Sequence, residues 1–334
     1  MTFSTAPPET NYPQTMPRAI FLDSGGVIND NDRRAPQWVQ HLMQYMPTTK
    51  LGGPGRLWGK GNTIMSDRLF KGENPLWKQL IDRAKDFRQF YREYHLFWVQ
   101  EGVRLVNNFL KEEYDVQQQQ QQGDDSNSNE RLPLLQLVLP ESEEEQIQIA
   151  YDAHLYCTSI VRADYPGAVE AILALRLDQG FTMYTCSGES APELELTLKT
   201  LGMSTLLAKE KEEGEKKKDG FLPTTHPTAT DISFEEAAGV VIKPVFTKLY
   251  GPDLIQCHKG SSEFYRRIFE DSGVDPRDAV VVDDKEYILA WAKVHGARTV
   301  LISTRDRRGK EMTIEVDQMQ VGGTVVKVVV PVVD

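Results

Sequence analysis

Several features that mark other classes of protein are scarce in this chain of 334 residues. It contains three cysteines, Cys157, Cys186 and Cys257, which are too few and too widely spaced for a disulfide framework or a zinc cluster. We therefore expect a reducing compartment, most simply the cytoplasm. No stretch approaches the roughly 18 apolar residues that a membrane span needs, so we expect no membrane partner.

Basic residues are also in deficit. The chain has 38 lysines and arginines against 49 aspartates and glutamates, which gives a net charge of -11. Such a chain repels nucleic-acid backbones, and no basic stripe with interleaved aromatic residues is present. We therefore expect no nucleic-acid partner. An acidic protein that binds an anionic small molecule needs a metal ion or local basic side chains to hold it. Nothing in the composition specifies an oligomeric state.

Three segments have little apolar sequence to bury. Residues 1–16 lack the basic start and apolar core of a secretory signal, so we expect a disordered tail there. The glutamine run Gln117–Gln122 and the polar residues after it predict a disordered loop over about residues 115–130. The charge run at residues 209–220 is typical of a solvated loop.

The chain does contain short apolar runs that end in polar residues. The runs, each with the residues that follow it, are Ala19–Leu22 with Asp23, Phe181–Cys186 with Ser187 and Gly188, and Ala279–Val282 with Asp283 and Asp284. Continuous apolar runs are typical of parallel strands that are buried on both faces. Helical patterns separate them, so the sequence predicts an α/β fold, a doubly wound Rossmann-like parallel sheet. The carboxyl ends of such strands share one edge of the sheet.

The predicted α/β core consists of residues 17–31 and 161–334, and a second, all-helical unit covers residues 32–160. Within this unit the glycine-rich segment Gly52–Asn62 predicts a loop between helices. Ser142 and Glu145 have the spacing of a capping box and predict the start of its last helix. In the core, further predicted elements are strands over Val240–Val245 and Thr299–Ile302, helices over Pro192–Leu201, Ser261–Ser272 and Tyr287–His295, and edge strands in the valine-rich C-terminal region.

The polar residues at the strand ends suit phosphoryl chemistry once Lys259, which precedes a predicted helix, is added. Carboxylates are hard oxygen ligands for Mg²⁺, and a metal ion with a lysine offsets the charge of a phosphoryl group. A free carboxylate can attack phosphorus and form a covalent intermediate. The sequence therefore predicts a Mg²⁺-dependent site for a small phosphorylated substrate.

The order of these motifs resembles the haloacid dehalogenase (HAD) superfamily. The first motif reads Asp23-Ser24-Gly25-Gly26-Val27, the second is Ser187 with Gly188, the third is Lys259 and the fourth is the pair Asp283-Asp284. The helical insert after the first motif resembles the type 1 cap of that superfamily, and the segment LYGPDLIQCHKG resembles a poorly characterised branch of it. The resemblance implies that Asp23 is the nucleophile. It further implies that Ser187, Gly188 and Lys259 bind the phosphoryl group, and that Asp23, the carbonyl of Gly25, Asp283 and Asp284 hold Mg²⁺.

Gly25 departs from the pattern of the superfamily's phosphatases. Those enzymes carry a second aspartate there, which protonates the leaving oxygen and then activates water. Two alternatives to a phosphatase therefore stay open. One is a phosphonatase- or dehalogenase-like enzyme whose leaving group needs no acid, for which Lys60 is the candidate Schiff-base lysine. The other is a catalytically silent member that binds a phosphorylated ligand or a protein.

Overall fold

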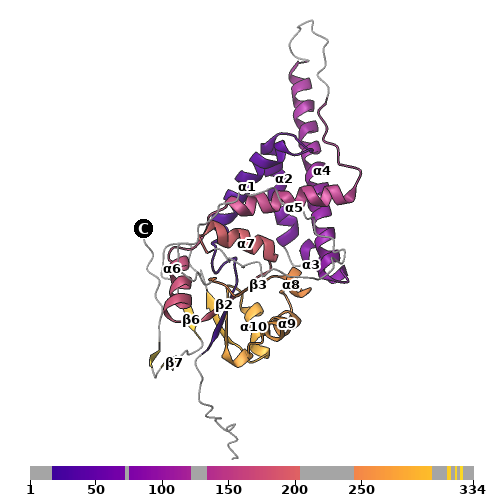
Figure 1. The fold of residues 1–334 in the computed structure, drawn as a ribbon. Helices are drawn as coiled ribbons and strands as arrows, with labels where there is room; N and C mark the ends of the chain where they lie inside the picture. The colour runs from indigo at the N-terminus through magenta and orange to yellow at the C-terminus, as the bar shows by residue number, and fades with distance from the viewer. Residues whose placement is uncertain are drawn as a thin grey trace, which may run out of the picture.

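The computed structural model describes residues 17–71, 75–121, 134–203 and 244–302, together with three short strands further on (Figure 1). The predicted tail at residues 1–16 and the charge run at 209–220 lie outside the described residues. Figure 1 shows two parts, an α/β core around a sheet and a group of long helices at one end of it. The predicted fold class, a parallel α/β sheet with an inserted helical unit, is confirmed.

The sheet has the strand order β3-β2-β1-β4-β5-β6. Its first five strands are parallel, and β6 pairs antiparallel with β5. The strand bounds are β1 Ala19–Leu22, β2 Thr182–Cys186, β3 Lys248–Tyr250, β4 Ala279–Asp283, β5 Arg298–Ile302 and β6 Ile314–Val316; β7 Gln320–Val321 and β8 Thr324–Val325 form a separate hairpin. The apolar runs therefore became the central strands. The strand predicted over Val240–Val245 is wrong in its described part, because the strand there lies at Lys248–Tyr250.

Both faces of the sheet are covered, as the alternation of side chains along a strand requires. Phe21 of β1 and Val281 of β4 pack on one face against α9 and α10, whereas Ile20 and Val280 pack on the other against α6 and α7. The helices of the core are α6 Ala168–Leu173, which continues as a π-type turn over Ala174–Asp178, α7 Ala191–Thr200, α8 Pro252–Ile255, α9 Ser262–Ser272 and α10 Glu286–Val294. Ser261 caps α9 through the backbone N–H of Phe264.

Residues 31–160 form the part that we call the helical insert. Its helices are α1 Asn31–Tyr45, α2 Gly55–Phe70, α3 Leu76–Arg83, α4 Phe87–Gln121 and α5 Glu143–Ile160, with a 3₁₀ turn over Met46–Thr48. They enclose an apolar cluster of their own that includes Leu42, Trp58, Trp98, Val106 and Cys157. Ser142 accepts a hydrogen bond from the N–H of Glu145, which confirms the predicted cap of α5. Among the described residues, no helix combines the length and the hydropathy of a membrane span.

The predicted glycine-rich loop over Gly52–Asn62 is wrong, because α2 begins at Gly55. Its glycines allow close packing on α1. A Cβ atom on Gly55 would lie 1.9 Å from the carbonyl oxygen of Met43, and one on Gly59 would lie 2.7 Å from the Met43 sulfur. Glycine normally disfavours a helix by about 1 kcal/mol, but here it permits contact between two helices.

The disordered loop predicted over residues 115–130 is also wrong in its first part. Helix α4 continues through the glutamine run to Gln121, and the rest of the predicted loop lies outside the described residues. Glutamine is a good helix former, and adding a residue to an existing helix avoids the unfavourable step of starting one. The long helix that precedes the run therefore extends into it.

Candidate active site

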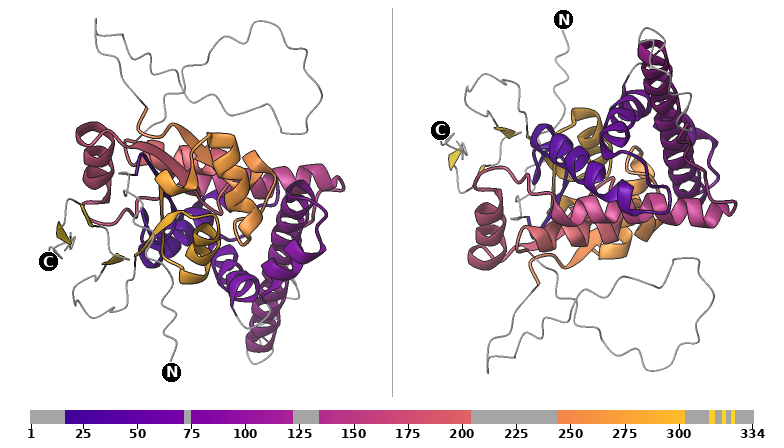
Figure 2. Two further views of the ribbon diagram at one scale, coloured as in Figure 1. Left: turned by 90° about the horizontal axis from the view of Figure 1, so that it is seen from below. Right: turned by 90° about the horizontal axis from the view of Figure 1, so that it is seen from above.

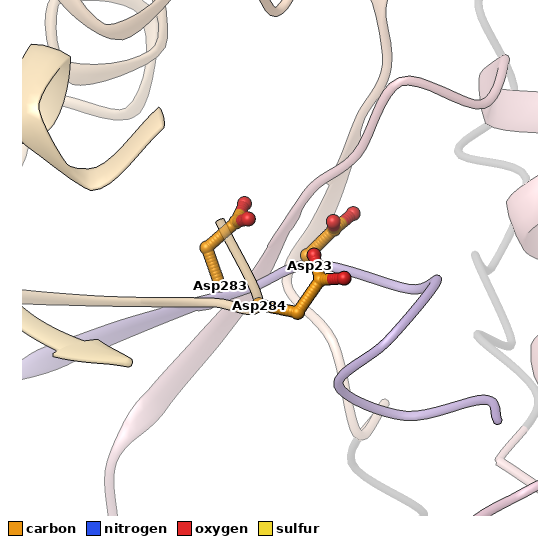
Figure 3. Close-up of side chains that lie close together, drawn as sticks. All are labelled: Asp23, Asp283 and Asp284. Atoms are coloured by element: carbon orange, nitrogen blue, oxygen red, sulfur yellow. The ribbon is translucent and has the colours of Figure 1, made fainter. Parts of the chain in front are cut away.

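Three carboxylates meet at the carboxyl edge of the sheet (Figure 3). Asp23 follows β1, Asp283 ends the neighbouring strand β4, and Asp284 comes next. One oxygen atom of each carboxylate lies within 4.8 Å of those of the other two. Figure 3 shows the three side chains projecting to the same side of the strand ends. This meeting follows from parallel pairing, because β1 and β4 run side by side and end together.

Lys259, in the turn between α8 and α9, holds two of these carboxylates. Its Nζ lies 2.6 Å from Asp23 Oδ2 and 2.6 Å from Asp283 Oδ2, and all three side chains are buried. Burial alone would lower the pKa of Lys259, but the charges of Asp23 and Asp283 raise it, so the ammonium group stays charged. Burial raises the pKa of Asp283 in spite of Lys259, which acts in the opposite direction.

The donor set fits a divalent cation. Three carboxylates face two lysines, Lys259 and Lys285, so the cluster keeps an excess of negative charge, and hard oxygen ligands suit Mg²⁺. Asp284 Oδ1 is buried and lies 3.8 Å from Lys285 Nζ, but it accepts no hydrogen bond from the described residues, so it can still offer a lone pair to a cation. Gly26 makes room for this carboxylate. It has a φ of 84°, and a Cβ atom there would lie 2.3 Å from Asp284 Oδ2.

The predicted ligand position at Gly25 lies in the turn after Asp23. A Cβ atom on Gly25 would lie 3.0 Å from Asn31 Oδ1, at the start of α1. Its backbone conformation is not of the left-handed kind, and the nearest atoms belong to a flexible side chain. The site therefore lacks a carboxylate at this position although the backbone can accept one.

Ser187 and Gly188 lie at the same edge of the sheet, directly after β2. Because Leu22 of β1 pairs with Thr185 of β2, the residues after the two strands are neighbours. Ser187 is buried, and its hydroxyl oxygen accepts a hydrogen bond of 3.3 Å from the N–H of Glu189. A Cβ atom on Gly188 would meet nothing within 4 Å, so the space beside this backbone is open.

Sequence analysis missed one ion pair beside this loop. Arg34, in the first turns of α1, pairs through Nη1 with Oε1 of Glu189. Burial alone would lower the pKa of Arg34, but the charges of Glu189, Glu193 and Asp23 raise it. The two partners are 155 residues apart. No local sequence pattern predicts an ion pair between residues so far apart. The sequence indicates only that Glu189 lies two residues after Ser187.

Two basic side chains, His258 and the candidate Lys60, contact aromatic rings of the helical insert. His258 stacks on Trp77 of α3, with ring centres 5.6 Å apart, and meets Phe90 of α4 edge to face at 5.4 Å. Burial, aided by Lys259, lowers the pKa of His258 to about 4, so the ring is neutral. Lys60 projects from α2, where its Nζ lies 3.7 Å from the centre of the Phe109 ring and half of its side chain is exposed.

The helical insert and the core enclose a small pocket of about 160 Å³ near His258. Its lining comes from the insert residues Ile81, Ala84, Asp86, Phe87 and Phe90 and from the core residues Gln256, Cys257 and His258. Figure 2 shows α4 beside the core segment that contains α8, and the two helices are in contact. The pocket therefore lies where the insert meets the segment leading to Lys259.

The chain was compared with known proteins. No family profile matches it, and no curated protein sequence does. Solved structures of 148 chains match it. Many of the matched proteins are named as HAD-like hydrolases.

One example is the HAD-hydrolase YfnB from Bacillus subtilis bound to magnesium, which is 11% identical with a TM-score of 0.46; the match covers 86% of this chain and 89% of that one. CbbY from Rhodobacter sphaeroides in complex with phosphate is 14% identical, with a TM-score of 0.41 and coverage of 90% and 92%. The L-2-haloacid dehalogenase from Xanthobacter autotrophicus is 12% identical, with a TM-score of 0.42 and coverage of 87% and 80%.

Proposed function

We propose that this protein is a HAD-type, Mg²⁺-dependent phosphatase that hydrolyses a small phosphorylated metabolite through an aspartyl-phosphate on Asp23. One observation carries the proposal: the Asp23 carboxylate is held by Lys259 at 2.6 Å, beside two further carboxylates at the end of the neighbouring strand. A buried carboxylate that forms an ion pair with a lysine can act as a nucleophile, and the adjacent acids suit a metal ion. The predicted cytoplasmic location stays part of this proposal.

Each proposed step uses a residue at this edge of the sheet. An oxygen of Asp23 attacks phosphorus, the ester P–O bond breaks, and the leaving oxygen departs with the bonding electrons. Ser187, the backbone at Gly188, and Lys259 bind the transferred phosphoryl group. Water then attacks phosphorus, the bond to Asp23 breaks, and inorganic phosphate leaves. Mg²⁺, held by Asp23, the Gly25 carbonyl, Asp283 and Asp284, would supply charge neutralisation for the phosphoryl oxygens.

Gly25 defines the substrates that this site handles best. No carboxylate stands at position 25 to protonate the leaving oxygen, so esters whose leaving group is stable without a proton are favoured. Aryl phosphates meet this condition and alkyl phosphates do not. The helical insert covers the site in this proposal, and its closure excludes water and selects the substrate.

The proposal is tested by turnover of p-nitrophenyl phosphate with Mg²⁺ or with a chelator. We expect metal-dependent release of phosphate that the Asp23→Asn variant loses. Intact Mg²⁺ binding without turnover of any phosphate ester would contradict a phosphatase and support the silent ligand-binding alternative.

Gly25 also favours a second candidate, an enzyme that cleaves a bond whose leaving group needs no acid, such as a carbon–halogen bond. Halide release from a 2-haloacid in the presence of chelator is its test. A phosphonatase-like reaction through Lys60 gains no support, because the half-exposed Lys60 ammonium lies over the ring of Phe109 and 4.0 Å from Glu112, both of α4.

A further inference from the structure

The ion pair between Arg34 and Glu189 joins two segments that the proposed reaction needs. Arg34 belongs to α1, the first helix of the insert, and Glu189 belongs to the loop that follows β2 and contains Ser187. Their side chains are 19% and 20% exposed, so the pair is largely removed from water. Mutual attraction between charges is much stronger there than at the surface.

Among the described residues, Arg34 is the side-chain partner of the Glu189 carboxylate. Its second carboxylate oxygen, Oε2, is buried and accepts no hydrogen bond from the described part of the chain. Arg34 therefore offsets this partly buried charge. Loss of one partner of a buried ion pair leaves the other charge uncompensated, which is far more costly than loss of a surface pair.

The loop around Glu189 is otherwise tied to the core. Ser190 and Glu193 form a capping box at the start of α7, and the N–H of Ala191 donates to Asp253 Oδ1 at 2.9 Å. On the other side, the N–H of Glu189 donates to the Ser187 hydroxyl oxygen. A displaced Glu189 would therefore act directly on Ser187, because its other neighbours are anchored.

Helix α1 is in turn fixed to the segment through which the chain returns to the core. Arg33 donates to the carbonyl of Asp164 at 2.8 Å, and the side-chain amide of Gln37 bonds to both the carbonyl and the N–H of Arg162. From the same helix, Arg34 reaches the Ser187 loop through its pair with Glu189.

We propose that Arg34 and Glu189 form a positioning pair, through which the first helix of the insert sets the Ser187–Gly188 loop for binding the phosphoryl group. The inference rests on the proposed function, since it takes this loop as the phosphoryl site. Arg34 acts through Glu189 and Ser187. Its positive charge also interacts with the Asp23 carboxylate.

The test compares the variants Arg34→Met, Glu189→Gln and the double variant with the wild-type protein. The readouts are the dissociation constant of inorganic phosphate in the presence of Mg²⁺, measured by calorimetry, and KM and kcat for p-nitrophenyl phosphate. We expect each single variant to weaken phosphate binding and raise KM on the order of tenfold, with a smaller change in kcat. The double variant should be no worse than the single variants, because both remove the same interaction.

Two further variants separate positioning from simple loss of structure. Arg56→Met removes another arginine–glutamate pair, the exposed Arg56–Glu113 pair between α2 and α4, and should leave phosphate binding unchanged. Arg34→Lys keeps the charge and should restore most of the phosphate affinity. If Arg34→Met fails to fold, Glu189→Gln and Arg34→Lys carry the comparison.

Phosphate binding within twofold of wild type in Glu189→Gln, or losses that multiply in the double variant, would overturn the inference. A wild-type protein that neither binds phosphate nor turns over the ester would instead overturn the proposed function. The two failures are therefore distinguishable in one set of measurements.

Discussion

At the scale of single residues, two adjacent glycines have opposite roles. Gly26 is required by its positive φ and by the Asp284 carboxylate that fills the space beside it. Gly25 has no such requirement, since only the movable side chain of Asn31 lies near its missing Cβ. A carboxylate that could serve as a proton donor is therefore absent at a position that accepts one.

A Gly25→Asp variant should fold and should hydrolyse alkyl phosphates at least about tenfold faster than the wild-type protein, because general acid–base catalysis typically contributes roughly 10²- to 10⁴-fold. For p-nitrophenyl phosphate, kcat/KM should change much less, because it reports formation of the aspartyl-phosphate, for which this leaving group needs no proton donor. The measurement is kcat/KM for both esters. Gly26→Ala is the control and should lose Mg²⁺ affinity, because a methyl group there displaces Asp284. Unchanged alkyl phosphate hydrolysis in a folded Gly25→Asp protein would refute this account of the missing acid.

Lys259 stabilises the fold as the counter-charge of two buried carboxylates. Its removal in Lys259→Met leaves the buried carboxylates of Asp23 and Asp283 close together without a counter-charge. Breaking a buried pair in this way is expected to lower the free energy of unfolding by about 3–5 kcal/mol in the presence of chelator. Excess Mg²⁺ should recover part of the loss. Denaturant unfolding with and without the metal measures both effects, and a variant as stable as wild type in chelator would contradict the buried ion pair.

At the scale of elements, the sequence predicted the strands and helix ends that depend on residues close together in the chain. The apolar runs at β1, β2 and β4 need burial on both faces, and the Ser142 cap of α5 depends on neighbours in sequence. The start of α2 depends on the close contact of its glycines with Met43 of α1. The glycines alone predicted a loop, because this contact with another helix cannot be read from the segment itself. Helix α4 reached Gln121 because the helix before it was already formed.

Packing of α4 against α5 buries two histidines, and this predicts a pH dependence of stability. His95 and His154 lie 5.2 Å apart between ring centres, and each Nδ1 donates to a carbonyl of its own helix. Burial lowers the pKa of His95 to about 3 and that of His154 to about 4. Unfolded histidine has a pKa near 6.5, so the unfolded chain takes up protons first as the pH falls.

The stabilising contribution is therefore complete above about pH 6.5 and declines as the pH falls from there toward 4. Each unit of pKa displacement corresponds to about 1.4 kcal/mol per group. The melting temperature between pH 7.5 and pH 5 is the measurement. The double variant His95→Gln/His154→Gln should show a shallower decline over this range than the wild-type protein. Equal slopes in the two proteins would argue against buried neutral histidines.

At the scale of the whole molecule, the site is assembled from segments far apart in the chain. The parallel pairing of β1 with β4 made the meeting of Asp23 with Asp283 predictable, because strands that run side by side end at one edge. The position of Lys259 was inferred from chemistry and resemblance, and the structure places its ammonium group between the two acids. The Arg34–Glu189 pair was not predictable, since it depends on how the insert sits on the core.

The central claim is that Asp23 becomes phosphorylated during turnover, and the absence of a carboxylate at position 25 makes this claim directly measurable. Without a group to activate water, hydrolysis of the aspartyl-phosphate should be slow relative to its formation, so the covalent species should accumulate. The decisive measurement is the intact mass of the protein after it is mixed with p-nitrophenyl phosphate and Mg²⁺ and quenched in acid. We expect one added phosphoryl group on the wild-type protein and none on Asp23→Asn. An unmodified wild-type protein during active turnover, or equal phosphorylation of Asp23→Asn, would contradict the account.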